Sequence, residues 1–244
     1  MANEKRIALV TGGNKGIGLE ISRNLASAGC VVLLGARNVE RGQQAVQQLE
    51  QSGFTDVHSI EIDVTRQDTI TAAAQLIEKE YGRLDILMNN AGVTLRGDGL
   101  PGTADVAVVK KIFDTNFFGA LRVAQTMLPL LRKSPAGRIV NTSSGLGSLT
   151  LNSDPAWAFK DVKVIGYNAS KAALNMLTIH LAYELRDTKI KVNSADPGYT
   201  KTDLNDNMGT QPVEVGAIEA TRLALLDDGG PTGQSFSKDG VDPW

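Results

Sequence analysis

The sequence predicts an α/β fold, a single domain built on a doubly wound parallel sheet. Short apolar runs alternate with longer segments of helical pattern along the chain, which is the arrangement of parallel strands joined by crossover helices. A cluster of glycines follows the first apolar run, where such folds turn from strand to helix. The 244 residues suffice for one such core, and no repeat, linker or low-complexity tract divides residues 1–244.

Each element follows from its local pattern. Apolar runs bounded by turn residues predict about seven strands, at Arg6–Val10, Cys30–Gly35, Val57–Ile62, Leu84–Met88, Arg138–Thr142, Ile190–Ala195 and Gly233–Phe236. Apolar residues three and four apart predict the helices between them, at Leu19–Ala26, Val39–Gln51, Thr69–Tyr81, Val106–Leu131, Tyr167–Leu185 and Val213–Leu226.

One of these helices contains residues that its pattern does not favour. Asn116 and Gly119 fall inside the long segment Val106–Leu131, although both have poor helix propensity. They predict a local kink in the helix, or a polar role for the asparagine.

The composition excludes several classes of function. A net charge of −2 provides no basic surface for nucleic acid. No segment approaches the length of a membrane span, and the polar start Met1–Arg6 is followed by an apolar run too short for a signal peptide. Cys30 is the only cysteine, so no intrachain disulfide can form, and we expect a cytoplasmic protein.

The glycine cluster has the position of a phosphate-binding turn. Glycines between a strand and a helix permit a tight bend and let the backbone approach a pyrophosphate, while the helix N-terminus supplies amide donors. The spacing is wider than in the common dinucleotide fingerprint. We expect a Rossmann-type nucleotide site here, formed by Gly12, Asn14, Lys15, Gly16, Ile17 and Gly18.

The end of the second predicted strand indicates which nucleotide is bound. Sites specific for NAD place an acidic residue there for the ribose 2′-hydroxyl. This chain has Ala36 and Arg37 instead. The planar guanidinium of Arg37 suits a 2′-phosphate, and Lys15 in the glycine turn would add a second charge, so the sequence predicts NADP(H).

A tyrosine and a lysine four residues apart begin the helix Tyr167–Leu185. This spacing is about one helical turn, so the phenol of Tyr167 and the ammonium of Lys171 project from one face. A neighbouring cation favours the phenolate and is expected to lower the pKa of the phenol. The pair therefore suits general acid–base chemistry.

Together, these features resemble the short-chain dehydrogenase/reductase family over nearly the whole chain. The motifs that carry the resemblance are Thr11-Gly12-x3-Gly16-Ile17-Gly18, Asp63-Val64, Asn89-Asn90-Ala91-Gly92, Asn116, Ser144, Tyr167-x3-Lys171 and Pro197-Gly198-x3-Thr202. The segments around Gly12–Gly18, Gly35–Arg37, Thr115–Gly119 and Pro231–Gly233 are similar to the NADPH-dependent carbonyl reductase branch. The resemblance implies a seven-stranded sheet in the order 3-2-1-4-5-6-7, with helices on both faces.

The resemblance also implies the catalytic groups. Tyr167 would protonate the carbonyl oxygen as hydride arrives from the nicotinamide, and Ser144 would hold that oxygen by a hydrogen bond. Ser143 is the competing serine, but the family pattern takes the second of such a pair. Lys171 would lower the pKa of the tyrosine and bind the nicotinamide ribose, and Asn116 would support a water that relays protons to the lysine.

The remaining cofactor contacts implied by the resemblance lie at the carboxyl ends of the strands, where such sheets bind ligands. Thr202 would bind the carboxamide and orient the nicotinamide ring. The other residues implied are Asp63, Val64, Asn90, Ala91, Gly92, Pro197 and Gly198, together with Tyr167 and Lys171 themselves.

The chain departs from the family pattern between Ser144 and Tyr167, where it is longer than the short members. The insert, around Leu151–Val164, includes Trp157 and Phe159. It could wall a substrate cleft with aromatic rings, or pack on the long helix near Asn116. A longer insert here accompanies monomers in the carbonyl reductase branch, whereas the family at large pairs these helices between subunits, so both a monomer and a homo-oligomer stay open.

The resemblance implies an NADPH-dependent carbonyl reductase acting on a small-molecule substrate, a ketone or aldehyde. Two alternatives remain: an alcohol dehydrogenase running in the oxidative direction, because the same residues serve both directions, and a non-catalytic NADP-binding sensor. No metal constellation is visible, and His58 and His180 lie far from the motifs. Segments 93–103, 146–164 and 199–213 are expected to shape the substrate site.

Overall fold

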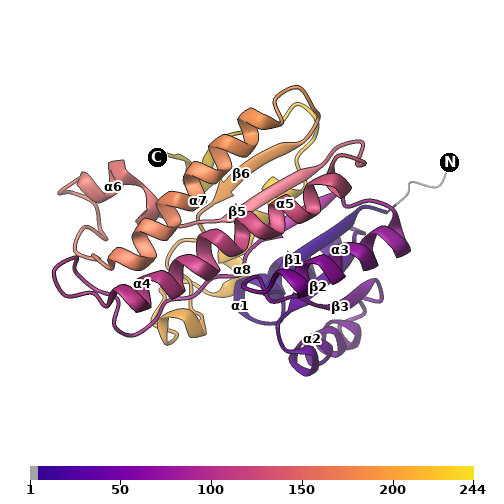
Figure 1. The fold of residues 1–244 in the computed structure, drawn as a ribbon, viewed down its shortest axis with the longest axis horizontal. Helices are drawn as coiled ribbons and strands as arrows, with labels where there is room; N and C mark the ends of the chain where they lie inside the picture. Colours follow the sequence, from indigo (N-terminus) through magenta and orange to yellow (C-terminus); the bar gives the residue numbers. More distant parts are fainter. Residues whose placement is uncertain (1–4) are drawn as a thin grey trace.

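In the computed structural model, which describes residues 5–244, an eight-stranded sheet has the order β3-β2-β1-β4-β5-β6-β7-β8 (Figure 1). Strands β1 to β7 are parallel, and β8 pairs antiparallel with β7. The predicted fold class and the implied order of seven strands are confirmed. The strands are β1 Ile7–Thr11, β2 Val31–Ala36, β3 Val57–Glu61, β4 Ile86–Asn89, β5 Arg138–Thr142, β6 Lys191–Ala195, β7 Ser235–Ser237 and β8 Gly240–Asp242.

Helices cover both faces of the sheet. One apolar core lies under α3, α5 and α7, which pass in front of the sheet in Figure 1, and a second lies under α1, α2 and α9. Because helices cover both faces of the sheet, its strands are buried on both sides, which explains their continuous apolar sequences. The helices are α1 Gly16–Ser27, α2 Val39–Gln51, α3 Gln67–Tyr81, α4 Val106–Phe113, α5 Ala120–Leu131, α6 Leu149–Ser153, α7 Ile165–Glu184, α8 Val213–Gly216 and α9 Ile218–Ala224.

The long helix predicted at Val106–Leu131 is interrupted by a π-helical turn at Asp114–Gly119. Such turns often mark functional positions inside α-helices. A Cβ at Gly119 would lie 2.7 Å from the Val64 side chain, so only glycine permits this approach to the segment after β3. Asn116 and Gly119, from which a local kink or a polar role was expected, both lie in this π-helical turn.

Two segments near the C-terminus differ from expectation. The helix predicted at Val213–Leu226 is divided into α8 and α9, and a Cβ at Gly216 would lie 2.4 Å from the Thr200 hydroxyl oxygen. The sequence analysis also missed β8, because each strand of the hairpin has only three residues. Its turn requires Gly240, which has a φ of 116°.

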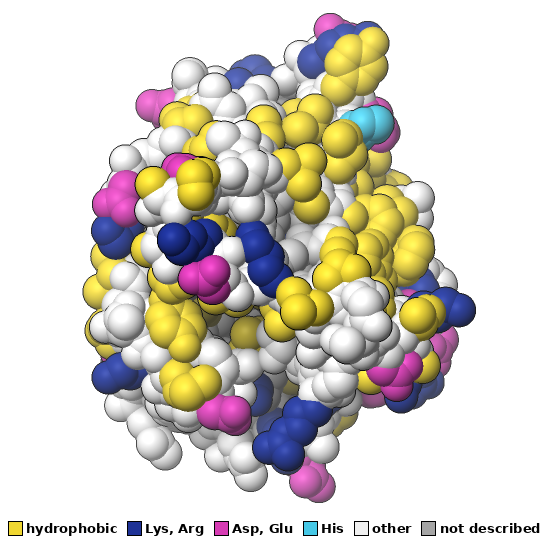
Figure 2. Space-filling model, turned by 90° about the vertical axis from the view of Figure 1, so that its left-hand side faces the viewer, with side chains coloured by type: hydrophobic (Ala, Val, Ile, Leu, Met, Phe, Trp, Pro, Cys, Tyr) yellow, Lys and Arg dark blue, Asp and Glu magenta, His cyan; other side chains and the backbone are white. Residues whose placement is uncertain are grey.

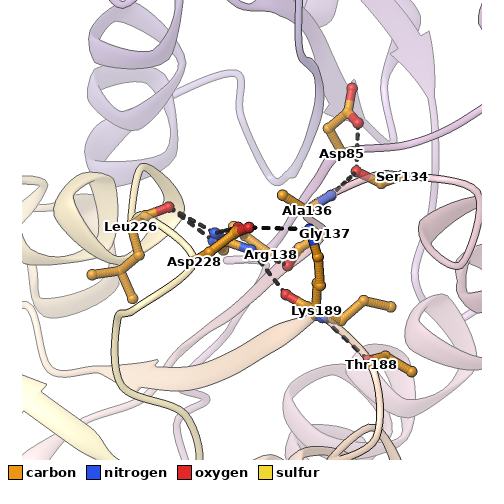
Figure 3. A network of polar contacts seen from close by, with 10 residues as sticks. Asp85, Ser134, Ala136, Gly137, Arg138, Thr188, Lys189, Leu226 and Asp228 are labelled. Atoms are coloured by element: carbon orange, nitrogen blue, oxygen red, sulfur yellow. Dashed lines mark hydrogen bonds and ion pairs between the residues drawn. The ribbon is translucent and has the colours of Figure 1, made fainter.

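Arg138 ties the amino ends of the strands to the C-terminal part of the chain (Figure 3). This side chain is 2% exposed although it carries a charge. Its guanidinium donates to the Leu226 carbonyl at 2.8 Å and 3.0 Å and to the Lys189 carbonyl at 3.2 Å, and it pairs with Asp228 at 3.3 Å. A buried charge is tolerated here because its donors are satisfied.

Arg138→Met is expected to lower the free energy of unfolding by about 2–4 kcal/mol, because buried carbonyl groups lose their donors. Lys189→Met is the matched control. The Lys189 side chain is 71% exposed and pairs with the same Asp228 at 3.5 Å, so its loss should cost less than about 1 kcal/mol. Urea unfolding of both variants measures the difference, and equal losses would contradict this assignment.

No helix within residues 5–244 combines the length and the apolar character needed to cross a membrane. The sequence analysis expected no signal peptide from the polar segment Met1–Arg6. Residues 1–4 of this segment lie outside the described residues.

Candidate active site

A cleft of about 1240 Å³ lies at the carboxyl ends of the strands. Its lining runs from the glycine turn after β1, past the ends of β2 to β6, to the insert and the C-terminal hairpin. All the site residues predicted from the sequence line this cleft except Asn116. On the face shown in Figure 2 the surface is hollowed near its centre, and hydrophobic side chains gather along one side of the hollow.

The glycine turn is held against the neighbouring strand β4. Gly12 and Gly16 have φ values of 63° and 55°, which other residues rarely adopt. The Asn90 amide donates to the Thr11 and Gly12 carbonyls at 3.0 Å and 3.3 Å, and a Cβ at Gly18 would lie 2.4 Å from that amide nitrogen. No side chain caps the N-terminus of α1, so its first amides stay available for a phosphate.

The end of the cleft next to β2 is basic. Ala36 ends this strand without an acidic side chain, and the exposed Arg37 follows it. Arg41, in the first turn of α2, lines the cleft too and was missed by the sequence analysis, although it stands four residues after Arg37. Lys15 is paired with Asp203 at 2.7 Å and is 61% exposed, so its remaining ammonium donors can still reach a phosphate.

Helix α7 places Tyr167 and Lys171 side by side, as the spacing predicted. The Lys171 ammonium lies 5.6 Å from the centre of the tyrosine ring and donates to the Thr142 carbonyl, at the end of β5, at 2.6 Å. Lys171 is only 4% exposed. Burial lowers the pKa of its ammonium to about 8, while Asp196 opposes this shift. The lysine therefore remains largely charged at neutral pH.

The pKa of Tyr167 moves in the direction opposite to the expected one. Burial of the phenol raises its pKa above the ordinary value, the charge of Asp196 raises it further, and a hydrogen bond with Ser144 lowers it. The sequence analysis considered only the cation four residues away. It omitted desolvation, which disfavours the phenolate and is here the largest cause.

The two adjacent serines have different environments. The Ser143 hydroxyl donates to the Asn175 side chain at 2.5 Å and is 2% exposed. Ser144 is half-buried and lines the cleft, and its hydroxyl lies near enough to the phenol of Tyr167 to lower the pKa of that phenol. These environments support the choice of Ser144 as the residue that contacts a substrate.

Asn116 is buried beneath the cleft rather than in its wall. Its side-chain oxygen accepts from the Val93 amide at 2.8 Å, and its nitrogen donates to the Val93 carbonyl and to the Ser170 hydroxyl, each at 3.0 Å. The side chain thereby joins the loop after β4 to helix α7. This arrangement gives Asn116 a positioning role, whereas the water relay stays a prediction.

A residue that the sequence analysis did not single out holds the N-terminus of α7. Asp98, in the loop after β4, accepts from the amides of Gly166 and Tyr167 at 2.8 Å and 2.9 Å, although it is 69 positions from the tyrosine. A Cβ at Gly166 would lie about 3.0–3.1 Å from this carboxyl group, so glycine permits its approach. A long-range cap has no local sequence signal.

The insert contributes to the cleft wall. Leu151, Trp157, Phe159, Val162 and Val164 all line the cleft. Trp157 packs edge-to-face on Phe159, which contacts Tyr199 from the segment after β6 in the same way. Of the two roles left open for the insert, the structure supports walling of the cleft.

Comparison with known proteins identifies the family. Residues 6–212 match the family described as short chain dehydrogenase. Carbonyl reductase (NADPH) 1 of Homo sapiens is 36% identical to this chain, over 100% of both proteins. The structure of salutaridine reductase from Papaver somniferum superposes with a TM-score of 0.83 and 30% identity, covering 96% of this chain and 100% of that one. NADPH-bound carbonyl reductase from chicken fatty liver gives a TM-score of 0.85 and 26% identity, covering 98% of this chain and 99% of that one.

The chain therefore belongs to the short-chain dehydrogenase family. Like the reductases it resembles, it is an oxidoreductase, and the resemblance inferred from the sequence motifs is confirmed.

Asp98→Ala is expected to lower the free energy of unfolding by about 1–2 kcal/mol and to speed amide hydrogen exchange at Gly166 and Tyr167, because the cap is lost. Asp105→Ala is the matched control, since Asp105 caps α4 through the Ala107 amide at 2.8 Å. It should destabilise the protein similarly but leave exchange at the start of α7 unchanged. Unchanged exchange in Asp98→Ala would refute the cap.

Proposed function

We propose that this protein reduces a ketone or aldehyde to an alcohol with NADPH. The observation that carries the proposal is the grouping of Ser144, Tyr167 and the buried ammonium of Lys171 on the wall of the cleft that the glycine turn begins. The relatives named above support it, because they include carbonyl reductases whose names specify NADPH.

The residues of this chain fit the cofactor. The uncapped N-terminus of α1 faces the cleft and suits a pyrophosphate. Arg37 and Arg41 flank the same end, where no acidic residue ends β2, which suits a 2′-phosphate. When bound, NADPH supplies the hydride.

Each catalytic side chain has a distinct task in the proposed reaction. The Ser144 hydroxyl donates a hydrogen bond to the substrate oxygen and holds it beside the phenol. Tyr167 donates its proton to that oxygen as negative charge develops on it. Lys171, held by the Thr142 carbonyl, places a positive charge near the phenolate that remains.

The proposed direction, reduction rather than oxidation, is supported by the relatives named above, which are reductases by name. Burial and the charge of Asp196 raise the pKa of Tyr167, so the tyrosine carries its proton at neutral pH and can donate it. The complete set of Ser144, Tyr167 and Lys171 in one cleft argues against a non-catalytic sensor.

We further propose that the protein works in the cytoplasm. Cys30, its only cysteine, is 1% exposed and unpaired, as suits a reducing compartment.

Tyr167→Phe is expected to lower kcat for a good carbonyl substrate about 10²–10⁴-fold, because the proton donor is lost. The ring still packs, so the Kd for NADPH should stay within a few-fold of the wild-type value. Tyr183→Phe is the control, since this tyrosine lies on the same helix but is 68% exposed. NADPH consumption followed by absorbance measures the effect, and wild-type turnover in Tyr167→Phe would refute the mechanism.

The wild-type kcat/KM is expected to favour NADPH over NADH by about 100-fold or more, because charge-assisted contacts of about 1.5–3 kcal/mol each hold the 2′-phosphate. Added salt should erode this preference. Ala36→Asp combined with Arg37→Ala should weaken the use of NADPH and improve that of NADH. Arg132→Ala, a change outside the cleft lining at a residue that pairs with Glu184, should leave the ratio unchanged. A wild-type enzyme using both cofactors equally well would contradict the assignment.

A further inference from the structure

The part of the cleft around the insert is walled by aromatic rings and carboxyl groups. Trp157, Phe159 and Tyr199 line it, with successive ring centres 5.6 Å and 5.8 Å apart. Asp196, just after β6, and Asp242, in β8, line the same cleft. Aromatic faces and carboxylates are the two kinds of group that attract organic cations.

Asp196 lies beside both the catalytic residues and the aromatic rings. Its Oδ1 accepts from the Gly198 amide at 2.9 Å. A Cβ at Gly145 would lie 3.1 Å from Asp196 Oδ2 and 3.3 Å from the indole of Trp157. The carboxyl group and the indole therefore flank the residue that follows Ser144.

Within residues 5–244, Asp196 forms no ion pair at bonding distance. Lys171 lies near enough to interact electrostatically, but its ammonium donates to the Thr142 carbonyl. Burial raises the pKa of the Asp196 carboxyl group. A cation bound beside the Asp196 carboxylate would offset the electrostatic cost of its burial.

The C-terminal hairpin adds a second carboxyl group to the cleft, and within the described residues this group too forms no ion pair. Asp242 Oδ1 accepts from the Ser237 hydroxyl at 2.8 Å, while its Oδ2 is buried and has no partner among the described residues. Lys238 lines the cleft as well, but it is paired with Asp239 at 2.7 Å. The hairpin therefore leaves one carboxylate uncompensated.

We propose that Asp196 is a specificity-determining residue and that the substrates are carbonyl compounds carrying a protonated amine. The inference rests on the proposed reductase function and deepens it. The substrate carbonyl lies at Tyr167 and Ser144, and the ammonium lies against the rings of Trp157 and Phe159, within reach of the carboxylate. A substrate with a carboxylate in that position is repelled.

The experiment compares three aldehydes that differ in charge but little in shape. The probes are 4-(dimethylaminomethyl)benzaldehyde, which is cationic at pH 7, its neutral isostere 4-isobutylbenzaldehyde, and the anionic 4-(carboxymethyl)benzaldehyde. The kcat/KM of each is measured with saturating NADPH for the wild type, Asp196→Asn and Asp206→Asn. Asp196→Asn removes the charge and keeps an oxygen for the Gly198 amide. Asp206→Asn removes the same charge from an exposed position outside the cleft lining.

For the wild type we expect the cationic aldehyde to exceed its neutral isostere by about tenfold in kcat/KM, and the anionic one to fall below it by a similar factor. Asp196→Asn should bring the kcat/KM values of the cationic and neutral probes within about threefold of each other. Asp206→Asn should retain the wild-type ratios.

Two results would overturn the proposal while leaving the proposed function intact. One is a wild type that reduces all three probes equally well. The other is an Asp196→Asn variant that loses the same factor on every probe, which would make the residue structural. If no probe consumed NADPH with the wild type, although the cofactor bound, the proposed reductase function itself would fail, and this inference with it.

Discussion

A ladder of buried polar contacts between the sheet and helix α7 determines where the catalytic pair lies. The Asn89 side chain of β4 donates to Asn141 of β5 at 2.9 Å, and Asn141 donates to Thr178 of α7 at 2.8 Å. Thr178 is also bonded to Ser194 of β6 at 2.8 Å. Such contacts specify one position of the helix along the sheet, whereas apolar packing alone tolerates sliding. Near the other end of the helix, the bond from Lys171 to the Thr142 carbonyl fixes the ammonium.

The same burial that positions these groups also sets their protonation. Lys171 is 4% exposed and Tyr167 is half-buried in the cleft wall, so burial lowers the pKa of the lysine to about 8 and raises that of the tyrosine. A charged lysine and a protonated phenol therefore coexist at neutral pH, which is the state a proton donor needs. Local spacing in the sequence shows that the two side chains share a helix face, but it carries no information about desolvation.

The sequence predicted the fold class, the strand order and the residues that line the cleft, because these depend on local periodicity and on motifs at strand ends. It placed Gly12, Tyr167 and Lys171 correctly in the cleft wall. It did not predict the direction of the tyrosine pKa shift, the short strand β8 or the cap supplied by Asp98. Each of these depends on contacts between distant positions, such as the bond of Asp98 to the amide of Tyr167.

The loop after β4 connects the segment after β6 with the start of the catalytic helix α7, so it contacts both sides of the cleft. The Thr94 hydroxyl donates to the Leu204 carbonyl at 2.8 Å, in the segment after β6, and Asp98 holds the start of α7 four residues further on. The loop therefore links the segment around Leu204 to the start of the catalytic helix. Variation in this loop can alter which substrates fit, provided that the carboxylate of Asp98 keeps its place. The two amide contacts of Asp98 hold the first turn of α7, on which the orientation of Tyr167 depends.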